Sequence, residues 1–190
     1  SESHCLDVIL RKTAAMMSLC CELAALLSEA NPEQEKALIN FGTQFGMAFQ
    51  LMDDAMDYNS EEDSLGKPPG NDFQEGHVTL PLLHLYENSE APLKKRIGSF
   101  IENKNLTPED FDYVLERMRE TKSVEYTLEL ARHYLEQAKS SIRSVTFPNP
   151  DFIKSLSPKT PVVAEPEELS TAARPAACAF AIAGLTGLLN

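Results

Sequence analysis

The sequence has little glycine, and its prolines are concentrated in two regions. Only 8 of its 190 residues are glycine, and most of the 12 prolines fall within residues 68–81 and 148–175. The segments outside these regions contain few helix breakers, which favours helices. No stretch alternates between apolar and polar residues as a half-buried strand would. The sequence therefore predicts an all-α protein.

Basic residues are outnumbered by acidic ones, and the formal net charge is −12. Nucleic-acid binding depends on lysine and arginine side chains that neutralise phosphates, so this charge argues against a nucleic-acid partner. It does not argue against small phosphorylated ligands, because an acidic protein can hold them through bridging divalent cations.

The four cysteines form neither a C-x-x-C pair nor a zinc-binding pattern. Cys5, Cys20 and Cys21 lie in an apolar helical stretch, so we expect them to be buried, reduced thiols in a cytoplasmic protein. The apolar run at 176–189 has about 14 residues, fewer than the ~20 that span a bilayer. The chain begins with Ser1 rather than methionine, and we expect that Ser1 is not the natural start.

The predicted helical body covers residues 1–147, and a proline- and alanine-rich tail covers 148–190. Within the tail, 148–175 reads as a loop or disordered segment and 170–189 as a weak apolar helix. Thr107 followed by Pro108 is a typical helix start. We expect no regular element in 59–76. Helices are predicted at 4–29, 32–58, 78–88, 92–103, 107–120 and 122–145.

An acidic cluster closes the second predicted helix. Asp53 and Asp57 are four residues apart and share one helix face, with Asp54 on the adjoining face. Like charges near a helix C-terminus are unfavourable unless a cation neutralises them. Carboxylate oxygens suit Mg²⁺, which shares its remaining ligands with waters and substrate phosphates. The alternative is a solvated acidic helix end without a ligand.

Two lysines could meet an anion. Lys67 lies in a glycine- and proline-rich loop, from which it could reach a phosphate as a point charge. Lys12 lies within an otherwise apolar helix face, where a charge is costly unless it reaches solvent or an anion. The alternatives are a solvent-exposed loop lysine at 67 and a lysine at 12 whose stem packs on the helix while its charge reaches water.

Several motifs in order resemble the trans-type polyprenyl diphosphate synthases, most of all the bacterial octaprenyl and decaprenyl type. The similarity extends from Ser1 to Val145. The motifs that carry it are Lys12-Thr13-Ala14, Phe41 through Gly46 to Phe49-Gln50, Asp53-Asp54-Ala55-Met56-Asp57-Tyr58, Leu65-Gly66-Lys67, Gly70-Asn71-Asp72, Glu75-Gly76 and Thr79-Leu80-Pro81-Leu82-Leu83.

The resemblance implies an isoprenoid-synthase helical bundle, of which residues 1–147 would be the C-terminal part. In this family two aspartate-rich motifs face each other and hold three Mg²⁺ ions. An allylic diphosphate on those ions loses its diphosphate, and isopentenyl diphosphate attacks the allylic cation. A proton is then lost, and the chain has grown by five carbons. Metals and lysines would stabilise the leaving group's charge.

The resemblance also implies residue roles. Asp53, Asp54 and Asp57 would bind Mg²⁺. Lys12, Thr13, Gln50 and Lys67 would be the catalytic residues that contact the allylic diphosphate. His77 stands at a substrate-binding position where the family usually has lysine, and histidine is shorter and only partly charged at neutral pH.

The family's first aspartate-rich motif is not in this sequence, so we expect this chain alone to be inactive as an enzyme. Three hypotheses follow. The chain is part of an active synthase, or a non-catalytic or regulatory subunit or truncated paralogue of a heteromeric synthase, or a plain helical interaction domain. We expect a homo- or hetero-oligomer, because half of a helical fold would expose apolar faces. An apolar product would bring peripheral membrane contact.

Overall fold

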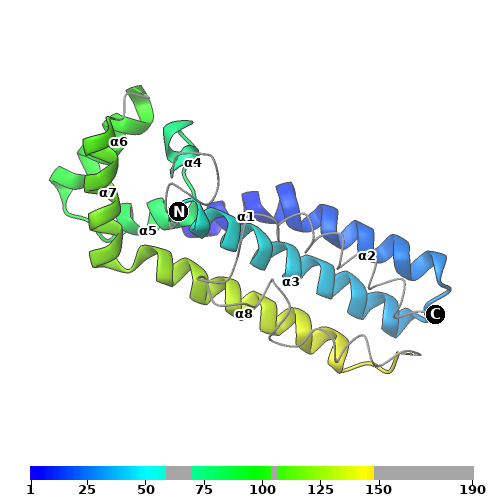
Figure 1. Ribbon diagram of the computed structural model, residues 1–190. Coiled ribbons are helices and arrows are strands. Elements are labelled where there is room, and N and C mark those ends of the chain that lie inside the picture. Colours follow the sequence, from blue (N-terminus) through cyan, green and yellow to red (C-terminus); the bar gives the residue numbers. More distant parts are fainter. Residues whose placement is uncertain (59–69, 104–106, 148–190) are drawn as a thin grey trace. The chain divides into compact units, whose positions relative to one another are not determined.

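A computed structural model describes residues 1–58, 70–103 and 107–147. These ranges contain helices and no strand, as predicted (Figure 1). In the part of the chain described, no helix is long and apolar enough to cross a membrane. The helices are α1 (Glu2–Ile9), a π-helical turn (Leu10–Ala14), α2 (Ala15–Leu27), α3 (Pro32–Met56), α4 (Asn71–Gln74), α5 (Leu80–Glu87), α6 (Ala91–Asn103), α7 (Pro108–Thr121) and α8 (Ser123–Arg143).

The chain divides into two compact units, which are described separately. The first unit comprises residues 1–7 and 51–130, and the second comprises 8–50 and 131–190. The long helices α3 and α8 each contribute to both units. The tail expected at 148–190, including its weak helix, lies outside the described residues.

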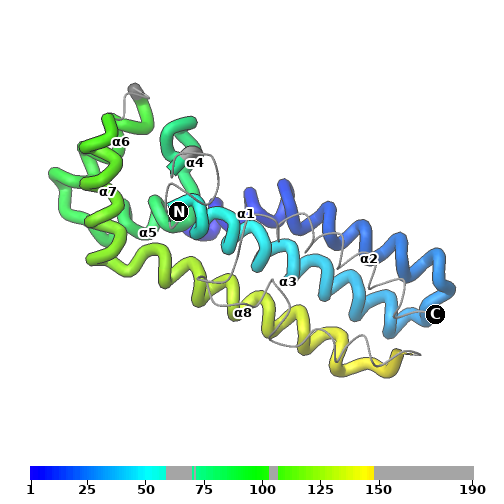
Figure 2. The backbone as a smooth tube through the Cα atoms, viewed as in Figure 1, coloured from blue at the N-terminus to red at the C-terminus, as the bar shows by residue number. Residues whose placement is uncertain are grey.

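The second unit packs α2, most of α3 and the later part of α8 side by side (Figure 2). Their apolar faces meet in one cluster in which the rings of Phe41 and Phe45 stack with centroids 5.7 Å apart. Burial of such side chains is the main source of stability for a helical bundle. The buried members are Cys21, Ala25, Ala37, Leu38, Phe41, Phe45, Ala48, Leu135, Ala138, Ile142 and Phe147.

The helix predicted at 4–29 is observed as a continuous helical run from Glu2 to Leu27, but it is not one regular α-helix. A π-helical turn at Leu10–Ala14 separates α1 from α2, and the backbone N–H of Ala15 donates to the carbonyl of Leu10. A bond between residues five apart accommodates one extra residue in the turn, and such turns are frequent at functional sites.

The boundary predicted at Asn31-Pro32 is confirmed by a reciprocal cap. Oδ1 of Asn31 accepts from the backbone N–H groups of Glu33 and Gln34, each at 3.0 Å. Oε1 of Gln34 accepts in return from the backbone N–H of Asn31, also at 3.0 Å. These three bonds satisfy backbone N–H groups around the start of the helix, so α3 begins where the sequence predicts.

The first unit has its own apolar cluster. Buried side chains from the end of α3, α4, α5, α6 and α7 meet in it, and the rings of Phe73 and Phe100 pack edge to face at 6.3 Å. The expectation of no regular element within 59–76 is wrong at α4, where Phe73 packs into this core. Residues 59–69 lie outside the described ranges. The buried members are Tyr58, Phe73, Leu82, Leu85, Ile97, Phe111, Val114 and Met118.

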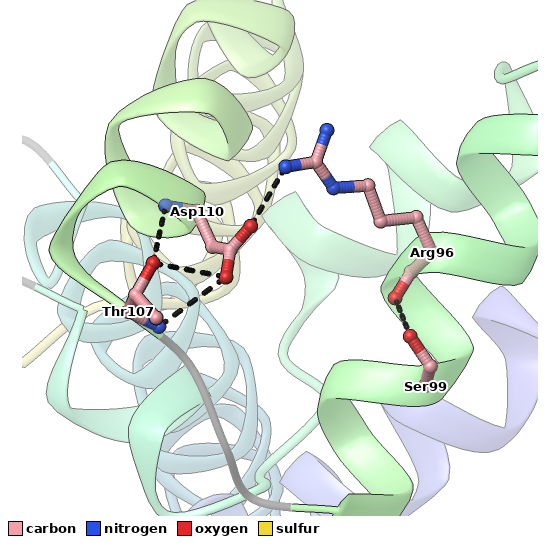
Figure 3. Close-up of polar contacts among 4 residues, drawn as sticks. All are labelled: Arg96, Ser99, Thr107 and Asp110. Carbon is pink, nitrogen blue, oxygen red and sulfur yellow. Dashed lines mark hydrogen bonds and ion pairs between the residues drawn. The ribbon is translucent and has the colours of Figure 1, made fainter.

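The start of α7 carries the cap that the sequence predicts at Thr107. The Thr107 hydroxyl accepts from the backbone N–H of Asp110 at 3.2 Å, and the Asp110 carboxylate accepts from the Thr107 backbone at 3.4 Å (Figure 3). Nη2 of Arg96, on α6, lies 2.7 Å from Oδ1 of Asp110. This ion pair joins the cap of α7 to α6.

Candidate functional site

Thr13 and Gln50 are 37 residues apart in sequence and hydrogen-bonded in the second unit. The Thr13 hydroxyl donates to Oε1 of Gln50 at 2.7 Å. Thr13 comes from the π-helical turn and Gln50 from α3, and both side chains are half-buried. The structure thus brings together two residues that the family resemblance implies as diphosphate contacts.

Two glycines of α3 allow the helices to approach closely enough for this bond. A Cβ at Gly46 would lie 2.5 Å from Cα of Ala14, which is the residue after Thr13. One turn earlier, a Cβ at Gly42 would lie 2.7 Å from Sγ of Cys21 and 2.8 Å from the Met17 carbonyl oxygen. No larger residue fits at either glycine without displacing α2 or the π-helical turn from α3.

Further hydrogen bonds join α2 to α3, nearer the start of α3 than Gln50. The Thr43 hydroxyl donates to the hydroxyl of Ser18 at 3.1 Å and lies 3.0 Å from the carbonyl oxygen of Ile39. Ser18 also donates to the Ile39 carbonyl at 3.2 Å. These bonds satisfy hydroxyl groups between two packed helices, so the close approach leaves few polar groups without partners.

Lys12 is exposed, although it adjoins the buried Ala14 and the half-buried Thr13. The apolar face on which the sequence places Lys12 therefore does not enclose its charge. The exposed position matches the alternative reading, in which the ammonium group reaches water.

The three aspartates at the end of α3 differ in burial. Asp54 is buried, with 5% of its surface exposed, while Asp53 and Asp57 are half-buried. Leu51 and Ala55 are fully buried, which explains the burial of the neighbouring Asp54 side chain. The sequence predicts that Asp53 and Asp57 share one face, and their similar exposure agrees with this.

Asp57 accepts hydrogen bonds from the backbone N–H groups of Gly70 and Asp72, which follow the undescribed segment. Its Oδ2 accepts from the backbone N–H of Asp72 at 3.0 Å. Its main-chain carbonyl accepts from the N–H of Gly70 at 2.8 Å. Part of the hydrogen-bonding capacity of this carboxylate is therefore used within the fold.

His77 is exposed and lies among acidic groups. Its Nδ1 is 3.6 Å from a carboxylate oxygen of Glu75 and 3.8 Å from one of Asp72. Contacts at this range and exposure contribute little energy. Lys67, the other loop residue predicted to contact the diphosphate, lies outside the described residues.

The donor set suits a hard cation, but it is incomplete by itself. In the described ranges, no three histidine, cysteine, aspartate or glutamate side chains are arranged to hold a metal ion. Two half-buried carboxylates on one helix face are nevertheless the kind of ligand that Mg²⁺ takes, because it keeps several waters and uses substrate oxygens. The residues fit a metal bound jointly with a phosphorylated ligand.

Two groups in the same unit as the acidic cluster have raised pKa values that the sequence does not indicate. The Tyr58 hydroxyl lies 3.2 Å from the Thr79 hydroxyl in the core, and burial raises the pKa of Tyr58 well above its usual range. Burial, with a smaller effect from the negative charge of Asp54, raises the pKa of Cys5 to about 11. Tyr58 ends the motif that begins at Asp53, but its contact with Thr79, 21 residues later, depends on the fold.

The expectation of buried, reduced cysteines holds fully for only one of the three described. Cys21 is buried, whereas Cys5 and Cys20 are half-buried, and all three are free thiols. Burial, followed by the neighbouring Cys20, raises the pKa of Cys21 to about 12. Helix periodicity places Cys20 beside Cys21, on a face that turns away from the core.

The family model described as Polyprenyl synthetase matches residues 1–118. The chain is 37% identical over 142 residues to the octaprenyl diphosphate synthase of Haemophilus influenzae, covering 75% of this chain and 43% of that protein. It is 36% identical over 130 residues to heptaprenyl diphosphate synthase component 2 of Bacillus subtilis, covering 68% of this chain and 36% of that one. The chain therefore spans less than half the length of these relatives.

Solved structures of polyprenyl synthases also resemble the chain. A polyprenyl synthase from Caulobacter crescentus, solved with calcium and isoprenyl diphosphate, matches with a TM-score of 0.72 at 27% identity. The match covers 98% of this chain and 50% of that one. Heptaprenyl diphosphate synthase from Staphylococcus aureus matches with a TM-score of 0.69 at 30% identity, covering 77% and 45%. By sequence and by fold, the chain belongs to the polyprenyl synthetase family.

Proposed function

We propose that the chain forms the diphosphate-binding and metal-binding part of a magnesium-dependent prenyltransferase. That enzyme would condense an allylic diphosphate with isopentenyl diphosphate to make a polyprenyl diphosphate in the cytoplasm. The observation that carries the proposal is the 2.7 Å hydrogen bond between Thr13 and Gln50. Thr13 and Gln50, which the family resemblance implies as diphosphate contacts, come from distant parts of the sequence, and their polar atoms meet where α3 packs on the π-helical turn.

Each residue has a task in the proposed reaction. Thr13 and Gln50 orient one another and present polar atoms to the diphosphate. Lys12 is exposed and can place its positive charge on a phosphate oxygen. Lys67 and His77 are proposed as further contacts from the segment after α3. Charged donors that meet the departing diphosphate stabilise the charge that develops as its bond to carbon breaks.

Asp53 and Asp57, with Asp54 behind them, are the groups proposed to hold Mg²⁺. When bound, Mg²⁺ neutralises phosphate charge and acts as a Lewis acid toward the leaving group. The half-burial of Asp53 and Asp57 lowers competition from water while leaving room for a ligand. Asp54, which is buried, is better suited to supporting the helix end than to meeting a metal.

A second candidate is a subunit of a heteromeric synthase. One relative is named as component 2 of a heptaprenyl diphosphate synthase, and another, from Schizosaccharomyces pombe, as subunit 1 of a decaprenyl-diphosphate synthase. Apolar side chains on α2 are also exposed, which suits a surface covered by other protein. They are Met16, Leu19, Leu23, Leu26 and Leu27. Light scattering that shows a clean monomer would contradict self-association through this face. A mixture with a full-length synthase that shows no gain in activity would contradict the hetero-oligomer.

Thermal unfolding tests the proposed function. A ligand that binds only the folded state must raise the melting temperature. We expect farnesyl diphosphate, as the allylic probe, to raise the melting temperature with Mg²⁺ present and to have less effect with EDTA. The same measurement on Asp53→Asn should remove the Mg²⁺-dependent part. No shift under any condition would contradict the proposal and favour a plain helical interaction domain.

A further inference from the structure

One face of α2 is apolar and exposed to solvent. The opposite face packs on α3, where Cys21 and Ala25 are buried. The exposed residues are spaced alternately three and four positions apart, which is the spacing with which one helix packs along another. An exposed apolar face of this kind marks a site that another surface covers. The residues are Met16, Leu19, Leu23 and Leu26, with Leu27 beside them, and each is between 49% and 85% exposed.

A second apolar stripe with the same spacing occurs near the end of the sequence. The segment 176–189 lies outside the described residues, and its sequence contains no charged side chain. In the weak helix expected there, one face would carry Cys178, Ile182, Leu185 and Leu189. At 1.5 Å per residue this stripe would be about 17 Å long, and the stripe from Met16 to Leu26 is about 15 Å long. The two stripes therefore match in spacing, in chemistry and in length.

The described part of the chain ends beside α2. Phe147 is 3% exposed in the apolar cluster that α2 shares with α3 and α8. Nε2 of Gln34, in the first turn of α3, donates to the carbonyl of Thr146 at 2.9 Å. The segment 176–189 is therefore anchored, through 148–175, near the turn that joins α2 to α3. About 28 residues can span up to about 90 Å, whereas α2 is about 20 Å long, so all of α2 is within reach.

We propose that the segment 176–189 docks as a helix on the exposed apolar face of α2 in the same chain. This inference does not depend on the proposed prenyltransferase activity. A segment of the same chain has an effective concentration of about a millimolar, whereas a second copy in solution is present at about micromolar concentration. The contact within one chain is therefore favoured over self-association through the same face. A partner subunit that uses this face must displace the segment.

Substitutions on either side of the proposed contact test it. Leu23→Asp places a charge in the middle of the α2 face, and Leu185→Asp places one in the stripe of the segment, and burial of either charge is costly. Phe180→Asp is the matched control. It also replaces a large apolar side chain of the segment by a charged one, but position 180 is on the opposite face of the expected helix. Circular dichroism checks that each variant keeps its helical body.

The readout is amide hydrogen exchange of 176–189, compared with exchange in a synthetic peptide of residues 170–190. We expect the amides in the whole chain to exchange at least about tenfold more slowly than in the peptide, at all protein concentrations over a roughly hundredfold range. Leu23→Asp and Leu185→Asp should each lower this protection about fivefold or more, and Phe180→Asp should change it by less than about twofold.

Three results would overturn the proposal. Exchange as fast as in the peptide would show that the segment does not dock. Protection that grows with protein concentration, together with a dimer mass by light scattering, would show that a second copy covers the face of α2. Protection that is lowered by Leu185→Asp but not by Leu23→Asp would place the segment on another surface and leave the α2 face for a separate partner.

Discussion

Gly46 and Ala14 approach so closely that a Cβ on the glycine would lie 2.5 Å from Cα of the alanine. This contact joins α3 to the π-helical turn beside Thr13. Gly46 lies four residues, or about one helical turn, before Gln50, which accepts the hydrogen bond from Thr13. The packing of one glycine is therefore linked to the geometry of the proposed diphosphate site.

Gly46→Ala should destabilise the protein by about 1–3 kcal/mol, because the added methyl group must push α3 away from the π-helical turn. Gly98 on α6 is the matched control, since a Cβ there meets nothing within 4 Å. Gly98→Ala should stabilise by up to about 1 kcal/mol through helix propensity. Denaturant unfolding measures both. A Gly46→Ala protein that gains stability as the control does would show that this contact is not tight.

Thr13→Val removes the hydroxyl that donates to Gln50 while keeping a similar side-chain shape. The free energy of unfolding should fall by about 1 kcal/mol, the typical value of one such bond. Thr13→Ser keeps the hydroxyl and should stay within about 0.5 kcal/mol of the unsubstituted protein. If valine and serine have equal effects in chemical denaturation, the hydrogen bond is not what stabilises this pair.

Gly70→Ala should be the most destabilising single methyl addition in the first unit. Its positive φ costs a non-glycine residue about 1–2 kcal/mol, and the clash with Phe111 costs about 1–3 kcal/mol more. The double variant Gly70→Ala/Phe111→Leu should regain part of the stability that is lost to the clash, but none of the stability that is lost to the positive φ. Calorimetric melting measures this. A Gly70→Ala protein that melts at the original temperature would contradict the described backbone.

Thr107→Ala should lower the free energy of unfolding by about 1 kcal/mol, because the hydroxyl caps the start of α7. Thr107→Ser preserves an acceptor and should cost only a few tenths of a kcal/mol. Unfolding by urea, followed by circular dichroism, compares the two. Equal losses in both variants would point to the threonine methyl group instead of the cap.

Arg96 holds the pKa of Asp110 below its ordinary value of 3.8, chiefly through their hydrogen bond. Because the pKa is lower in the folded state, the stabilisation is fully present above about pH 3.8 and is lost as the pH falls through the folded value. Arg96→Met should raise the pKa of Asp110, which a carbon-detected NMR titration can follow. An unchanged pKa in that variant would mean that Arg96 is not the cause.

Local signals in the sequence predict the helices and their starts well. The caps at Asn31 and Thr107 depend on residues within three positions, so both helix starts are predicted where the structure has them. The face shared by Asp53 and Asp57 follows in the same way from helical spacing.

Features that depend on distant contacts could not be predicted in this way. The π-helical turn packs against Gly46, more than 30 residues away, and nothing in its own residues departs from an ordinary helical pattern. The short helix α4 depends on two such contacts. Phe73 is buried in the core of the first unit, and the Asp72 N–H donates to the Asp57 carboxylate. The pairing of Thr13 with Gln50 likewise depends on how α3 packs, although the family resemblance names both residues.

The central claim is that this chain holds a diphosphate through Mg²⁺ and the Thr13–Gln50 pair. Calorimetric titration with inorganic diphosphate, in Mg²⁺ and then in EDTA, tests it most directly. We expect binding in Mg²⁺ that is lost in EDTA, weakened by Asp53→Asn and by Thr13→Val, and unchanged by Gly98→Ala. Binding of equal strength in EDTA, or no binding in Mg²⁺ by a protein that is folded by circular dichroism, would show that the chain does not hold a diphosphate in this way.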